Sequence, residues 1–220
     1  MSEPRVHNRI ERIGIDESGK GDYFGPLVIA AVFVDATTQG ELRLMQVRDS
    51  KKISDGRILE MAPDIKTICP HSVIAIGPPK YNELYAKIRN LNRLLAWGHA
   101  KALETLLERV TCERAISDQF AHERLILSML QEKGRKIVLE QRTKAESDLA
   151  VAAASILARA EFLLRLNRLS SEVGTTLPKG ASPAVELAAK MIVKKHGQER
   201  LGLVAKLHFK TTKAVMASET

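Results

Sequence analysis

Short apolar runs of strand length alternate with longer amphipathic stretches along the chain. Residues 13–16 and 27–34 are two apolar runs joined by a glycine-rich loop, and this pattern predicts a pair of antiparallel strands. Further strands are predicted at residues 72–76, 114–117 and 136–139. Three successive strands followed by strands that alternate with helices indicate an α/β protein, with helices packed on a mixed sheet.

The spacing of apolar residues also predicts the helices that cover this sheet. They are expected at residues 54–61, 81–110, 122–133, 149–169 and 183–196. Ser54 can cap the first of them, and Pro78 and Pro79 precede the second. The fourth is so rich in alanine that it should pack closely against another element, and Gly174 should end it. Residues 205–213 are expected to be basic and irregular.

The charge balance favours a protein that meets a polyanion. The net charge is +8 and the pI is about 9.6, although a merely soluble basic enzyme would fit these numbers as well. From residue 179 to the end, eight Lys or Arg side chains stand against three Glu side chains. This excess is compatible with a duplex-binding surface and equally with a solvated helix face.

The remaining bulk features limit the setting of the protein. Cys69 and Cys112 lack CxxC spacing, so neither a zinc site nor a disulfide framework is expected. The N-terminal residues are polar and charged, unlike a signal peptide, and no apolar run reaches the length of a membrane span. We therefore expect a cytoplasmic protein with no membrane partner.

Acidic residues follow three separate predicted elements. Asp16 and Glu17 end the first strand, Asp118 ends the strand at 114–117, and Glu146 and Asp148 precede the alanine-rich helix. Each alone could be a turn former or a helix cap. Neighbouring strand residues point to opposite faces, so Asp16 and Glu17 can share a cation only where the strand bends away. As a set, the acids predict a site for hard divalent cations, which prefer oxygen ligands.

A glycine-framed lysine follows the first acidic pair directly. The backbone of Gly19-Lys20-Gly21 can approach a phosphate or a sugar hydroxyl closely, although Lys20 could be a simple turn lysine. Lys51 and Lys52 could hold phosphates, pair with the acids or face water. The GxxxxGK[ST] pattern of a nucleotide-binding P-loop is absent.

Several long motifs in the chain resemble one known family. The segments GIDESGKGDYFGPLVIAAV, DSKKISD, ISDQF, TKAESDLAVAAASILAR, LPKGAS and AKLHFK are similar to those of the type 2 ribonucleases H, most of all the ribonuclease HIII branch. The resemblance covers about residues 13 to 212. It implies the ribonuclease H-like fold, a mixed five-stranded sheet flanked by helices with a C-terminal helical extension. It also implies an endonuclease that cuts the RNA strand of RNA–DNA hybrids with Mg²⁺ or Mn²⁺.

The family motifs assign roles to particular residues of this chain. By resemblance, Asp16, Glu17 and Asp118 are the first three acids and hold metal ions. Glu146 is the expected fourth catalytic acid, with Asp148 as the alternative. Two-metal hydrolysis would leave 5′-phosphate and 3′-hydroxyl ends. A final set is expected to contact the hybrid: Gly19, Lys20, Gly21, Lys51 and Lys52.

Two departures from the family pattern bear on substrate choice. Ribonuclease HIII proteins usually carry an N-terminal substrate-binding domain, whereas about a dozen residues precede the first motif here. Ribonuclease HII uses a C-terminal tyrosine to recognise a single ribonucleotide in DNA, but the tyrosines here are Tyr23, Tyr81 and Tyr85. This favours cutting within runs of RNA over the ribonuclease HII mode.

The expected protein is therefore a monomeric catalytic domain over residues 1–220, with residues 180–220 as a basic helical extension. Two other functions stay open on composition alone. One is a non-catalytic nucleic-acid binding module, in which the acids are structural caps. The other is a metal-dependent phosphatase of small phosphate esters.

Overall fold

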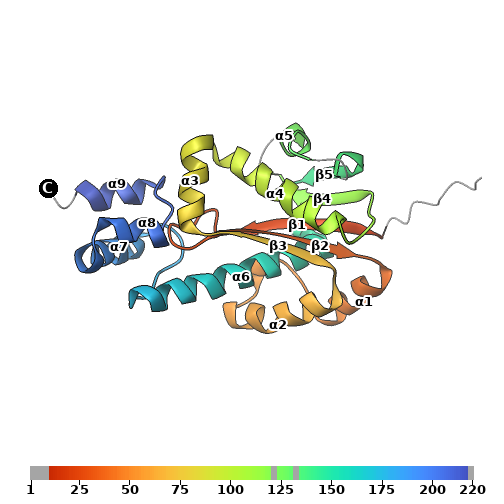
Figure 1. Cartoon of the computed structure of the whole chain (residues 1–220). Coiled ribbons are helices and arrows are strands. Elements are labelled where there is room, and N and C mark those ends of the chain that lie inside the picture. The colour runs from red at the N-terminus through yellow and green to blue at the C-terminus, as the bar shows by residue number, and fades with distance from the viewer. Residues whose placement is uncertain (1–9, 120–122, 131–133, 218–220) are drawn as a thin grey trace, which may run out of the picture.

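A mixed five-stranded sheet forms the centre of the molecule (Figure 1). The computed structural model describes residues 10–119, 123–130 and 134–217. The strands are β1 (Arg12–Ser18), β2 (Leu27–Val34), β3 (His71–Ile76), β4 (Arg114–Asp118) and β5 (Val138–Arg142). Their order is β3-β2-β1-β4-β5, with β1 antiparallel to β2 and parallel to β4. The predicted α/β class and five-stranded sheet are confirmed.

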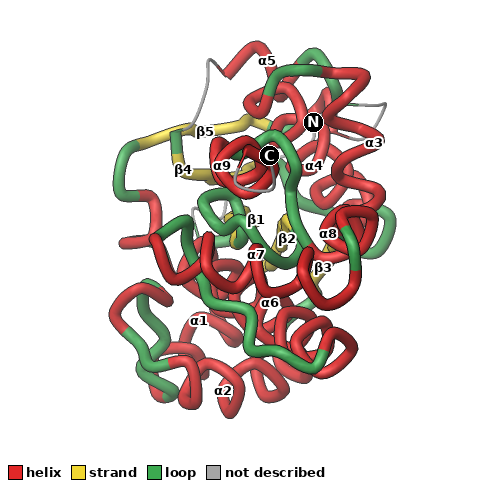
Figure 2. Tube along the Cα trace, turned by 90° about the vertical axis from the view of Figure 1, so that its left-hand side faces the viewer, coloured by secondary structure: helices red, strands yellow, loops and turns green. Residues whose placement is uncertain are grey.

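Helices cover both faces of this sheet. One face carries α1 (Ala36–Leu44), α2 (Asp55–Ile68) and α6 (Leu149–Val173), and the other carries α3 (Pro78–Ile88), α4 (Leu91–Leu107) and α5 (Glu123–Leu127) (Figure 1). Beyond the end of β1 lie α7 (Pro183–His196), α8 (Gln198–Val204) and α9 (Lys210–Ala217). Figure 2 views the molecule from that end, with these helices in front of the strands. The expected C-terminal helices are therefore present.

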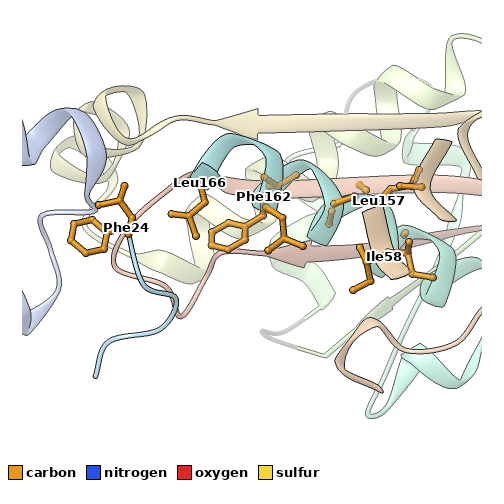
Figure 3. Close-up of a cluster of buried hydrophobic side chains, with 14 of the residues drawn as sticks. Phe24, Ile58, Leu157, Phe162 and Leu166 are labelled. Atoms are coloured by element: carbon orange, nitrogen blue, oxygen red, sulfur yellow. The ribbon is translucent and has the colours of Figure 1, made fainter. Parts of the chain in front are cut away.

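The alanine-rich helix α6 lies directly against β1. A Cβ atom added to Gly14 would be 2.1 Å from the carbonyl carbon of Ala150, so only a glycine allows this approach. Larger side chains of α6 fill the space further along, where Leu157, Phe162 and Leu166 pack in one cluster (Figure 3). The prediction of close packing is confirmed, and α6 ends at Gly174 with a φ of 63°.

The single helix predicted over residues 81–110 is wrong. The chain forms α3 and α4 instead, because Arg89 adopts the left-handed conformation with a φ of 50°. The side chain of Asn90 then accepts a hydrogen bond from the Arg93 amide and caps the next helix. Apolar residues keep helical spacing across this break, so periodicity alone missed it.

Other boundaries also differ from those expected. Helix α2 continues past Pro63 to Ile68, and α1, which a capping box of Asp35 and Thr38 begins, was not predicted. Strand β5 starts two residues later than expected, and the helix expected at 122–133 is the shorter α5, with residues 122 and 131–133 outside the described part. The segment 205–213 is irregular only as far as Lys210, where α9 begins.

Two further expectations concern the whole chain. Cys69 and Cys112 are both free thiols, as their spacing indicated. Within the described ranges, none of the helices is both long and apolar enough to cross a lipid bilayer.

Candidate active site

The first and third predicted acids lie side by side at the ends of neighbouring parallel strands. Ile15 of β1 is paired with Ser117 of β4, so the next residues in each strand, Asp16 and Asp118, occupy adjacent positions. They also share a face of the sheet, since side chains alternate in step along paired strands. The fold therefore brings together two acids that are about a hundred residues apart in sequence.

Asp16 and Glu17 point to opposite faces of the sheet. Asp16 faces α6, where its carboxylate has a hydrogen bond with the Ser155 hydroxyl. Glu17 faces α4, where His99 Nε2 lies 3.0 Å from Glu17 Oε2. The bend was expected at Ser18-Gly19, where the strand ends: β1 stays paired with β2 as far as Ser18 and Val28, and Gly19 then turns the chain with a φ of 88°.

The environment of Asp16 favours its neutral form. Burial, together with the charge of Glu17, raises the pKa of the Asp16 carboxyl to about 8. The hydrogen bond from the Glu17 backbone N–H at 2.9 Å, the hydrogen bond with Ser155 and the charge of Lys51 oppose this rise without cancelling it. At neutral pH a charged Asp16 therefore needs an additional positive charge close by.

The environment of Glu17 has the reverse effect. Burial alone would raise the pKa of Glu17, but the hydrogen bond and charge of His99 and the charge of Lys20 outweigh it and hold the pKa below its ordinary value. Lys20 Nζ lies 3.5 Å from Glu17 Oε1. His99 is wholly buried in α4 and so fixes the side of the sheet on which the carboxylate lies.

The loop before α2 connects Asp16 with Glu146. Asp49 caps the short 3₁₀ turn over Ser50–Lys52 by accepting a hydrogen bond from the Lys51 amide. In this turn, Ser50 Oγ lies 2.6 Å from Ser155 Oγ, the same hydroxyl that bonds Asp16. Lys51 Nζ lies 3.9 Å from Glu146 Oε1. Glu146 therefore lies at the α6 side of the sheet with Asp16.

Asp148 is engaged in the structure of the fold. Its carboxylate accepts hydrogen bonds from Arg12 Nε at 2.9 and 2.7 Å, and both side chains are nearly buried. The same carboxylate caps α6 by accepting from the Ala150 amide. Within the described residues, the ion pair of Glu146 is with the ammonium of Lys51 at the long distance of 3.9 Å, so Glu146 keeps the greater freedom to bind a ligand.

The donor set suits a hard divalent cation. Its members are carboxylates, and one of them, Asp16, lies in surroundings that oppose its charge. Within the described residues, no three His, Cys, Asp or Glu side chains are already gathered closely enough to hold an ion. Asp16 and Asp118 are adjacent through strand register, whereas Glu17 is held on the other face by His99.

The predicted glycine loop is tightly folded and joined to the C-terminal part of the chain. Gly19 has a φ of +88°, and the backbone N–H of Asp22 donates a hydrogen bond to the Gly19 carbonyl at 3.3 Å. Asp22 Oδ1 accepts from the Gly180 amide at 2.7 Å, and Gly180 belongs to the LPKGAS motif. Gly21 is unobstructed, because a Cβ added there would meet nothing within 4 Å.

Of the roles considered for the predicted lysines, the structure shows pairing with acids and exposure to water. Lys20 and Lys51 pair with acids of the site, while Lys52 is exposed. Sequence reasoning missed the residues that orient the acids, namely His99, Ser50 and Ser155. A polar residue inside the apolar face of a helix was the available signal for His99 and Ser155, whose neighbours on α4 and α6 are mostly buried apolar side chains.

Comparison with known proteins gives a consistent match. The family model described as Ribonuclease HII matches residues 13–212. The chain is 49% identical to the Ribonuclease HIII of Protochlamydia amoebophila over 204 residues, which cover 93% of this chain and 68% of that protein. It is 46% identical to the Ribonuclease HIII of Chlamydia felis, covering 94% and 71% of the two chains.

Solved structures match the fold as well. The crystal structure of Bst-RNase HIII in complex with Mn²⁺ has a TM-score of 0.89 at 36% identity, covering 97% of this chain and 71% of that one. The RNase H3 of Aquifex aeolicus has a TM-score of 0.76 at 31% identity, covering 92% and 74%.

Proposed function

Because the chain belongs to the ribonuclease HII family, we propose that the acids at the ends of β1 and β4 carry out its hydrolytic reaction. The protein is a type 2 ribonuclease H, an endoribonuclease that acts on RNA–DNA hybrids. The observation that carries the site assignment is the register that sets Asp16 beside Asp118. Glu146 lies on the same face, connected through Lys51 and Ser50.

The enzyme depends on metal ions, as its family does, and a similar structure contains Mn²⁺. In our proposal Asp16, Glu17 and Asp118 would hold Mg²⁺ or Mn²⁺, with Glu146 completing the set. Two bound cations would neutralise charge on the phosphate and lower the pKa of the attacking water. Asp16, whose pKa is about 8, is the carboxyl group whose ionisation such a charge would favour most.

The other residues of the site would position the substrate. The backbone of Gly19–Gly21 would approach the sugar 2′-hydroxyls, which distinguish RNA from DNA. Lys20, Lys51 and Lys52 would contact backbone phosphates, the first two by exchanging their carboxylate partners for phosphate. Cleavage of the P–O3′ bond would leave 5′-phosphate and 3′-hydroxyl ends.

We assign the fourth acid to Glu146 in preference to Asp148. The carboxylate of Asp148 already balances the buried Arg12 and caps α6, so ligand binding there would disrupt both interactions. Glu146 is partly exposed, and its ion pair is with the end of an exposed lysine at 3.9 Å, which a ligand can displace at little cost.

The C-terminal helices are the proposed source of additional hybrid affinity. The exposed lysines in this part of the chain are Lys194, Lys195, Lys210 and Lys213. Replacing them with Gln should weaken hybrid binding and flatten its dependence on salt concentration, by about one unit of slope for each phosphate that a lysine no longer neutralises. An unchanged slope would remove this region from the binding surface.

We propose a monomeric, cytoplasmic enzyme in which residues 180–220 extend the catalytic domain.

One comparison of substrates tests the proposed function. The protein is incubated with a continuous RNA–DNA hybrid, a DNA duplex carrying one ribonucleotide, and a mononucleotide ester, each with Mg²⁺, Mn²⁺ or EDTA. We expect metal-dependent cleavage of the continuous hybrid to 5′-phosphate ends, slow cleavage at the single ribonucleotide, and no turnover of the ester. A band shift without products would indicate a binding module, and preferred cutting at the single ribonucleotide would indicate the ribonuclease HII mode.

A further inference from the structure

A buried lysine lies next to the substrate loop and has no part in the reaction described above. Lys206 has no exposed surface, although it carries an ammonium group. Removing such a charge from water is costly unless other groups satisfy it. Lys206 Nζ donates to the carbonyl of Gly25 at 2.7 Å and lies 3.4 Å from that of Phe24 and 3.5 Å from that of Pro26.

These acceptors are consecutive residues of a single loop. The backbone joins the same two segments, since Lys206 N donates to Tyr23 O at 2.8 Å and Gly25 N donates to Val204 O at 2.9 Å. Phe24 and Ala205 form an isolated β-bridge between these contacts. The segment before α9 therefore holds the loop between β1 and β2 through both its backbone and one buried side chain.

The far end of this loop is the glycine turn that would meet the hybrid. Gly19 approaches Pro26 so closely that an added Cβ would lie 2.1 Å from the Pro26 carbonyl oxygen. This oxygen is also within 3.5 Å of Lys206 Nζ. One carbonyl thus connects the buried ammonium with the start of the Gly19–Gly21 turn.

We infer that Lys206 is a positioning residue for substrate binding: its ammonium fixes the carbonyls of Phe24, Gly25 and Pro26, and through them the Gly19–Gly21 turn that contacts the hybrid. The inference rests on the proposed role of that turn. It explains why a charged residue is buried at this position, because an apolar residue of similar length would fill the same volume without fixing the loop.

The surroundings of Lys206 bring the pKa of its side chain close to neutral pH. Burial lowers the pKa of Lys206 to about 7, and the charge of Asp22 opposes that shift. The ring of Tyr81 lies 5.7 Å from Nζ, and the pKa of His208 is lowered by burial and by the charge of Lys206. The ammonium and the free amine can both donate to carbonyls, so the loop keeps a donor on either side of neutral pH.

The test compares Lys206→Met with a matched control, Asn82→Ala. Asn82 holds the same segment from α3, donating to the carbonyls of Gly202 and Ala205 and accepting from the Leu207 amide. Among the contacts of the described chain, its side-chain hydrogen bonds go to this segment rather than to the loop after Gly19. Each variant is studied as the full chain for its melting temperature, for amide hydrogen exchange of residues 19–25, and for kcat and KM on the continuous hybrid.

We expect Lys206→Met to speed amide exchange in the loop and to raise KM about tenfold, with kcat changed much less. Asn82→Ala should lower the melting temperature while leaving loop exchange and KM near those of the parent protein. Unchanged loop exchange in Lys206→Met overturns the inference and leaves the substrate role of the turn intact. Faster exchange with an unchanged KM also overturns it, and in that case the failure lies in the proposed role of the turn. Equal KM changes in both variants would show a general loss of stability and would overturn it too.

Discussion

The two faces of the sheet treat neighbouring carboxylates in opposite ways. On the α6 face, burial and the charge of Glu17 raise the pKa of Asp16 to about 8. On the α4 face, His99 and Lys20 hold the pKa of Glu17 below its ordinary value despite its burial. Adjacent residues of one strand thus differ in charge at neutral pH because the strand turns them toward different helices.

This difference indicates which carboxylate responds to a cation. Glu17 already has a hydrogen bond with His99 and an ion pair with Lys20, so a divalent ion would have to compete with both side chains for it. Asp16 accepts a hydrogen bond from the Glu17 amide and has a hydrogen bond with Ser155, and the charge of Lys51 lowers its pKa less than either of these. The α6 face therefore has the larger unmet need for positive charge, and Asp118 and Glu146 lie on that face as well.

Replacing Asp16, the carboxylate on the α6 face, should have the largest effect, and that effect is on catalysis. Asp16→Asn should lower metal-dependent cleavage of the hybrid by about a thousandfold or more, equivalent to roughly 4 kcal/mol of transition-state stabilisation. Hybrid binding, measured by fluorescence anisotropy, should persist. The exposed Asp64 on α2 gives the matched control, because Asp64→Asn makes the same chemical change away from the site. Normal cleavage by Asp16→Asn would show that the assignment of this residue is wrong.

The next effect separates the two acids near the start of α6. Asp148→Asn leaves the buried Arg12 without its counter-charge and should cost about 3 kcal/mol of unfolding free energy. Glu146→Gln should leave stability nearly unchanged, since both Glu146 and its partner Lys51 reach solvent, yet it should reduce cleavage strongly. Urea unfolding and hybrid cleavage of both variants measure this. If Glu146→Gln keeps full activity while folded Asp148→Asn loses it, the fourth acid is Asp148.

The smallest expected effect is on how the stability of the protein changes with pH, which differs between the two faces of the sheet. The folded protein keeps a proton on Asp16 up to about pH 8, whereas the unfolded chain releases it near the ordinary value of 3.8, so this group costs the fold stability as pH rises between those values. With EDTA present, the melting temperature of Asp16→Asn relative to the parent should be unchanged near pH 4 and should exceed it by about 2 °C or more at pH 8.

Glu17→Gln should show the opposite sign. The folded pKa of Glu17 is lowered, so its contribution to stability is present above the ordinary value of 4.5 and is lost as pH falls through the folded pKa. This variant should therefore melt below the parent at pH 7. Equal shifts for both variants would mean that the two faces do not differ.

How much of this the sequence could predict depends on the range of each interaction. The strands, the close packing of α6 and the adjacency of Asp16 and Asp118 follow from local patterns and from the family motifs. The division of the second helix does not, because the left-handed Arg89 lies inside an apolar repeat that continues across it.

The partners of the acids were less accessible to prediction. His99 follows Glu17 by 82 residues and Ser155 follows Ser50 by 105, so their contacts depend on how the helices dock. From the sequence alone, Lys206 counts as one basic residue of a basic C-terminal part, although in the structure it is buried against the loop after β1. Charge counting treats every lysine as exposed and cannot detect this.

Calorimetric titration of Mn²⁺ into the protein at pH 7, in two buffers with different enthalpies of ionisation, tests the central claim most directly. A cation that binds the α6 face must displace the proton of Asp16, so the parent protein should release about one proton for each ion of the tight site. Asp16→Asn should bind more weakly and release none. Tight binding without proton release, unchanged by Asp16→Asn, would contradict the account.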